Sequence, residues 1–173
     1  MNKNQQRLKQ MVLMALFIAM SVIGAFIKIP SPTGSVSLDS LPGYLAALLI
    51  GGIPGAIVAF LGHLASAATT GFSMTLPIHL LVACQMAVIM LILGYLVKRI
   101  HLAVVIVLGM LLNGIAAPAT FILIPGFGTA FFSAMVLPLS IASIIVILIA
   151  GAIYYPLRNV KAIKELQKIN HGL

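Results

Sequence analysis

Ionisable side chains are scarce in this 173-residue sequence, so those in apolar surroundings are the first candidates for chemistry. Asp39 is the only carboxylate side chain in the first 164 residues, and His63 and His79 lie within apolar stretches. An acid and two imidazoles can exchange protons, pair with one another or hydrogen bond a ligand. Asp39 has three open interpretations: it caps the helix expected to follow it, pairs with Lys28, or contacts a ligand.

Amides, hydroxyls and aromatic rings in the apolar stretches extend this candidate set. A polar group in lipid costs free energy unless it has a partner or a ligand, and hydrogen bonds between helices are the alternative to ligand contact. Phenylalanine rings offer stacking surfaces for a flat ring. We expect substrate-binding residues among the following: Ser35, Asp39, Tyr44, His63, His79, Gln85, Asn113 and Phe131.

Familiar catalytic motifs are missing from the sequence. It contains no Gly-Lys dipeptide and therefore no phosphate-binding loop, and it contains neither HExxH nor GxSxG nor paired carboxylates. Cys84 is the only cysteine, which excludes an intramolecular disulfide and a CxxC metal or redox site. We therefore expect that the protein is not an enzyme and that it holds neither a metal nor a cofactor of its own.

The elements that position these residues are apolar helices. The chain is 62% hydrophobic and only 7% charged, and a membrane-spanning helix needs ~20 predominantly apolar residues. The sequence predicts an all-α integral membrane protein with a single membrane domain over residues 1–173. Its predicted helices occupy residues 8–28, 40–52, 54–70, 77–97, 102–124 and 131–155, followed by a basic tail over 156–173.

The number of spans follows from the basic residues. The second and third runs are separated by Gly51, Gly52 and Pro54, so they form either two short helices or one kinked helix. With six spans, nine of the ten basic residues lie on the side of both termini, and Lys28 is the exception. With five, the basic tail would face outward, against the positive-inside rule. We expect six transmembrane helices and cytoplasmic termini. The sequence contains no basic stripe with interleaved aromatic residues, so it does not indicate nucleic-acid binding.

Three connections then face outside, at residues 29–39, 71–76 and 125–130, and all are rich in Gly, Pro, Ser and Thr. They are either plain turns or gates over a pocket. The first connection lies in the segment "IKIPSPTGSVSLDSLPGY", which is too long for a tight turn. We expect it to form a lid over a cavity that opens to the outside.

The first helix carries small residues one turn apart, at Ala15 and Ala19. Small residues at this spacing allow two helix backbones to approach closely in lipid. The pair indicates either docking of a partner or ordinary packing within the chain.

Taken together, the six helices in a chain of this length, the basic ends and Ala15-x-x-x-Ala19 resemble the substrate-binding S components of prokaryotic energy-coupling factor (ECF) vitamin transporters. The resemblance covers nearly the whole chain. It implies a multi-pass subunit of the prokaryotic plasma membrane that captures a vitamin from outside. It also implies that Ala15 and Ala19 dock onto a transmembrane coupling subunit, that two ATPase subunits use the ATP, and that the first outer loop closes over the vitamin.

Within that family, the segments "PSPTGSVSLDSLPGYLAALLIGG", "GHLASAATTGF" and "LPIHLL" look most similar to S components assigned to α-ribazole, a precursor of cobalamin. The chain has no Trp, whereas S components for larger or charged vitamins often carry Trp or several charged residues. Two alternatives remain. One is an S component for pyridoxine, hydroxymethylpyrimidine or biotin. The other is a stand-alone carrier coupled to an ion gradient, with Asp39, His63 and His79 as proton or ion sites.

Overall fold

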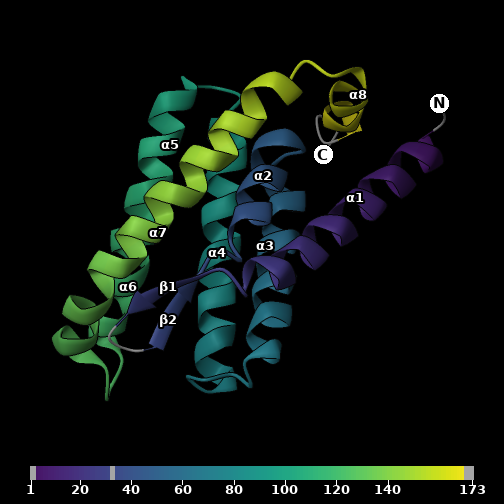
Figure 1. Ribbon diagram of the computed structural model, residues 1–173. Helices are drawn as coiled ribbons and strands as arrows, with labels where there is room; N and C mark the ends of the chain where they lie inside the picture. Colours follow the sequence, from purple (N-terminus) through teal and green to yellow (C-terminus); the bar gives the residue numbers. More distant parts are fainter. Residues whose placement is uncertain (1–2, 32–33, 170–173) are drawn as a thin grey trace.

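The computed structural model describes residues 3–31 and 34–169, with side chains described for 4–28 and 37–167. Helices dominate this part of the chain (Figure 1). In order, the elements are α1 Lys3–Gly24, strands β1 Lys28–Ser31 and β2 Gly34–Ser37, α2 Leu41–Leu49, α3 Gly52–Thr69, α4 Leu76–Leu96, α5 Leu102–Leu111, the π-helical turn η1 Leu112–Ala116, α6 Ala117–Ala119, the 3-10 turn η2 Thr120–Leu123, α7 Gly128–Leu157 and α8 Lys161–Ile169.

Five helical segments are long and apolar enough to cross a membrane, within the part of the chain that the structure describes. They are α1, α3, α4, the continuous segment from α5 to η2, and α7. A sixth helix, α2, occupies the position of the predicted second span but has only nine residues. At ~1.5 Å per residue it is about half as long as a bilayer core is thick, so it does not span by itself.

Helix α2 lies at the centre of the packing instead. All its residues except Leu41 are buried, and it contacts α1, α3, α4 and α7. Small residues allow this close packing: a Cβ atom on Gly55 of α3 would lie 2.5 Å from Cα of Ala47 in α2. The outer helices carry large exposed apolar side chains, such as Leu137 and Leu148 of α7. This distribution suits a protein whose surroundings are lipid.

The two ends of the molecule differ in what they contain. Figure 1 shows the start of α1, helix α8 and the connection between α4 and α5 at one end. The connections that follow α3 and η2 lie at the opposite end. The structure thus groups the basic segments together, and their assignment to the cytoplasm stays a prediction from the sequence.

The connection between α1 and α2 contains a β-hairpin, which an all-α prediction did not include. Strands β1 and β2 pair antiparallel, with Lys28 opposite Ser37 and Ser31 opposite Gly34. The main-chain N–H of Leu38 also donates to the oxygen of Ile27, at 3.1 Å. The hairpin contacts α7. Pairing satisfies backbone groups that an irregular loop would have to leave to water, and it gives the connection a defined shape.

Candidate functional site

A cavity of about 410 Å³ opens between the hairpin segment, α3, α4, the α5–η2 segment and α7. Its wall reaches the connection after α3 at Ser73 and Met74, so it lies toward the end of the molecule opposite α8. Its volume is within the range of small-molecule sites. The polar residues of the wall are Lys28, Ser37, Asp39, Ser40, His63, Ser66, Thr70, Ser73, His79, Gln85 and Asn113.

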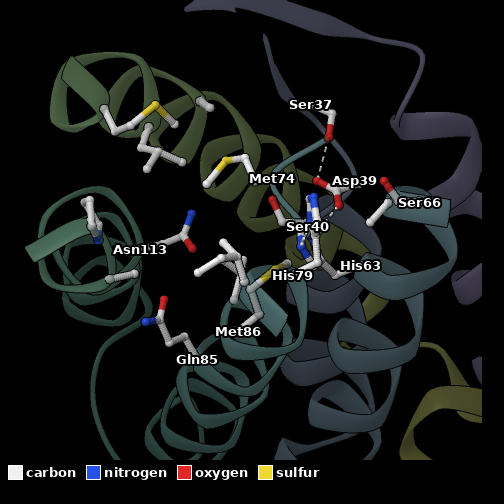
Figure 2. A pocket seen from close by; sticks show the side chains of 18 of the residues that line it. Ser37, Asp39, Ser40, His63, Ser66, Met74, His79, Gln85, Met86 and Asn113 are labelled. Atoms are coloured by element: carbon white, nitrogen blue, oxygen red, sulfur yellow. Dashed lines mark hydrogen bonds and ion pairs between the residues drawn. The ribbon is translucent and has the colours of Figure 1, made fainter. Parts of the chain in front are cut away.

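Asp39 is buried and uses both carboxylate oxygens (Figure 2). The hydroxyl of Ser37 donates to Oδ1 at 2.9 Å, and His63 Nδ1 lies 2.9 Å from Oδ2. The interpretation of Asp39 as a helix cap was wrong: α2 is preceded by Ser40, and no side-chain capping bond forms there among the described residues. Asp39 also does not pair with Lys28: the basic side chain that its carboxylate contacts is His63.

His79 extends this contact into a row of three residues. Its Nδ1 lies 3.2 Å from His63 Nε2, and the two rings are tilted by 35° with centroids 5.3 Å apart. Phe72 packs its ring edge-on against His79. The other nitrogen of His79, Nε2, is buried and has no hydrogen-bond partner within the described part of the chain. A buried polar atom without a partner is costly, so Nε2 is the group in this row that a ligand can satisfy.

Figure 2 shows the amides of Gln85 and Asn113 on the side of the cavity away from Asp39. The amide nitrogen of Gln85 donates to the hydroxyl of Thr120, and that of Asn113 donates to the hydroxyl of Ser143, each at 2.7 Å. The second N–H and the carbonyl oxygen of each amide form no hydrogen bond to the described residues. Both amides are therefore held in place and still able to bind a ligand.

The π-helical turn that carries Asn113 has a local cause. Pro118 has no N–H and cannot bond to the main-chain oxygen of Gly114, four residues earlier. The hydroxyl of Ser140 in α7 donates to that oxygen instead, at 3.2 Å. The N–H of Ala117 bonds to Leu112, five residues back, as in a π-helix. The additional residue in this turn changes the direction in which its side chains point.

Aromatic and sulfur-containing side chains form the apolar part of the wall. Phe121 and Phe131 line the cavity with ring centroids 4.8 Å apart. Phe127 packs against both rings, at 5.4 and 4.9 Å, but is not part of the wall. Met74 and Met135 add further apolar surface. The cavity thus offers apolar surface for a flat ring together with hydrogen-bonding groups.

Six of the expected site residues lie in the wall of this one cavity: Asp39, His63, His79, Gln85, Asn113 and Phe131. Tyr44 lies elsewhere, because it belongs to α2 and is completely buried in the core beside Gly109. Its hydroxyl has no partner among the described residues. Ser35 lies in β2, and its side chain is outside the described part. That these six residues contact a ligand stays a prediction.

The expected site residues named one by one did not include Ser37 or Phe121. Ser37 lies in the segment expected to form a lid, two residues before Asp39, and this position was the available signal for it. Phe121 had no comparable signal. The described residues contain no group of three His, Cys, Asp or Glu side chains arranged to hold a metal ion.

The expected docking residues lie on a different surface. Ala15 and Ala19 are exposed on α1, which runs along the edge of the molecule in Figure 1. The exposed side chains of Met11, Val12 and Leu16 surround them. This face packs against no other described element, and its role as a docking site stays a prediction.

In the comparison with protein families, the model described as "ECF transporter, substrate-specific component" matches residues 9–158. Neither a curated protein nor a solved structure shows significant similarity to the chain.

Proposed function

Because the chain belongs to the family of ECF transporter substrate-specific components, we propose that it is the vitamin-binding subunit of an ATP-driven importer. Membership places it among membrane-embedded substrate-binding subunits of transporters. The observation that carries the proposal is the cavity, whose wall combines hydrogen-bonding groups such as His79 with the aromatic ring of Phe131. The chain captures its substrate from outside in this cavity and performs no catalysis.

The proposed substrate is α-ribazole, which combines a ribose with the flat ring of dimethylbenzimidazole. Phe121 and Phe131 offer apolar surface to such a ring, and the side chains of His79, Gln85 and Asn113 offer hydrogen bonds to ribose hydroxyls. The cavity volume of about 410 Å³ leaves room for a fused aromatic ring system joined to a sugar. The carboxylate of Asp39 is occupied by His63 and Ser37, so it does not require a cationic group on the ligand.

Transport by this subunit depends on partners. We propose that Ala15 and Ala19 dock onto a transmembrane coupling subunit, and that two ATPase subunits hydrolyse the ATP. The chain itself then needs no cofactor. The proposed location is the plasma membrane of a prokaryotic cell, with both termini in the cytoplasm. The exposure of both alanines on an outer face of α1 supports the docking part of this proposal.

A second candidate is a stand-alone carrier that uses a proton gradient. The observation in its favour is the row of Asp39, His63 and His79, in which neighbouring groups lie within hydrogen-bonding distance. Uptake in proteoliposomes distinguishes the two. The first function requires added ATP and the partner subunits, whereas the second proceeds with this chain and a pH gradient alone.

Calorimetry on the purified protein tests the substrate. We expect α-ribazole to bind more tightly than pyridoxine, hydroxymethylpyrimidine or biotin. Asn113→Ala removes a hydrogen-bonding group from the cavity and should weaken binding roughly tenfold. Tyr44→Phe serves as the control, because its hydroxyl lies outside the cavity wall. If α-ribazole did not bind while another of these vitamins did, the choice of substrate would be wrong and the transport role would stand.

A further inference from the structure

The row of Asp39, His63 and His79 has a defined hydrogen-bond direction. A carboxylate only accepts hydrogen bonds, so His63 must donate from Nδ1 to Oδ2. A histidine with one ring proton then has an acceptor at Nε2, and His79 must donate to it from Nδ1. The proton of His79 is thereby placed on Nδ1. Its buried and unpartnered Nε2 is left as an acceptor.

We propose that Asp39 and His63 are positioning residues that fix His79 Nε2 as a hydrogen-bond acceptor, so that the site selects a ligand with a hydroxyl or N–H donor at this point. This inference rests on the proposed function and deepens it by naming the ligand group that His79 recognises. A ligand with an acceptor at the same place leaves two lone pairs facing each other, which binding sites reject strongly.

Removing the carboxylate makes the direction of the row testable. In Asp39→Leu, which carries a similarly branched apolar side chain, no acceptor faces His63 Nδ1 and nothing holds the proton of His63 there. His63 can then carry its proton on Nε2 and donate to His79 Nδ1, so the proton of His79 moves to Nε2. Asp39→Asn is the milder change, because the Ser37 hydroxyl that donates to Oδ1 can also accept, and the amide can keep its oxygen toward His63.

The other groups around the row do not interfere with this reversal. Lys28 is the one further charged side chain in the cavity wall as described, and it is exposed. The α5–η2 segment and α7 contribute only uncharged residues to the wall. Asp39 is therefore the group that sets the direction of the row.

Nitrogen-15 NMR of histidine-labelled protein reads the position of each ring proton without any ligand. We expect the protons of His63 and His79 on Nδ1 in the natural sequence and at least partly on Nε2 in Asp39→Leu. His101→Asn is the control, since His101 caps α5 through Ala103 and asparagine is also a good capping residue. This variant should leave both signals unchanged. Protons on Nε2 in the natural sequence, or no change in Asp39→Leu, would overturn the proposal.

Binding of α-ribazole reads the consequence for the ligand. Asp39→Leu should weaken binding about tenfold, because His79 then presents a donor to a donor, and His101→Asn should bind as the natural sequence does. Asp39→Asn, whose amide oxygen can still accept from His63, should keep more of the affinity. Reversed tautomers with unchanged affinity would show that His79 does not select the ligand.

A failure of the proposed substrate looks different from a failure of this inference. If the natural sequence did not bind α-ribazole, the NMR measurement would still decide the direction of the row. Pyridoxine, which also carries hydroxyl donors, then takes the place of α-ribazole in the binding measurement.

Discussion

The side-chain amide of Gln167 in α8 donates to the main-chain oxygen of Leu49 at 2.9 Å, which joins residues 118 positions apart. Leu49 is the last residue of α2, where main-chain oxygens lack partners within the helix. The neighbouring Leu166 is 5% exposed and belongs to the apolar core. Helix α8 therefore closes the end of the short central helix, at the end of the molecule opposite the cavity (Figure 1).

Truncation of Leu166 should make α8 detach from the apolar core more often. Leu166→Ala removes buried apolar volume that is worth about 2 kcal/mol or more, which raises the open fraction of α8 at least about tenfold. Lys161 and Lys164 are exposed trypsin sites in this helix. Cleavage there should accelerate accordingly, as measured by mass spectrometry of timed digests. Ala162→Ser, at an exposed position, is the control. Equal cleavage rates for both variants would mean that Leu166 does not hold the helix in place.

Docking through α1 is tested with bulky side chains. Ala15→Trp combined with Ala19→Trp should prevent close approach of a partner helix and reduce ATP-driven uptake about tenfold or more. Vitamin binding by the isolated subunit should be unchanged. Ile144→Trp combined with Leu148→Trp is the matched control, because this pair has the same spacing and is exposed on α7. Full uptake by the α1 variant would exclude this face as the docking site.

The aromatic part of the cavity wall gives a matched pair of substitutions. Phe131→Ala removes a ring from the wall and should weaken vitamin binding about tenfold. Phe127→Ala removes a ring from the same cluster but outside the wall, so it should change affinity much less. Calorimetry measures both constants. Equal losses would indicate that the cluster acts through its overall packing and not through contact with the ligand.

Packing around α2 predicts a loss of stability at a glycine. In Gly55→Ala the new methyl group would lie 2.5 Å from Ala47, so the two helices must separate, at a cost of about 1–3 kcal/mol. The melting temperature in detergent should fall by several degrees. Ile57→Ala, on the exposed side of α3, is the control: it changes a larger part of a side chain but should lower the free energy of unfolding by about 0.5 kcal/mol or less. A larger loss for Ile57→Ala would contradict this account of the core.

Much of the helical organisation follows from local features of the sequence. An apolar run of about 20 residues forms a helix in lipid because its backbone groups have no other partners there. Gly51 and Pro54 separate α2 from α3 in a similarly local way. The hairpin before α2 was not predicted, because its strands are short and pair with each other only across a turn.

What the sequence alone determined is the class of the protein: composition and run length make it a membrane protein of apolar helices, and its few polar residues are candidates for a site. Tertiary structure alone decided which of them meet. Asp39 reaches His63 across 24 positions, while Tyr44 turns into the core. The reason is rotational: apolar composition places a segment in lipid, but only packing against neighbours determines which side of each helix faces the cavity.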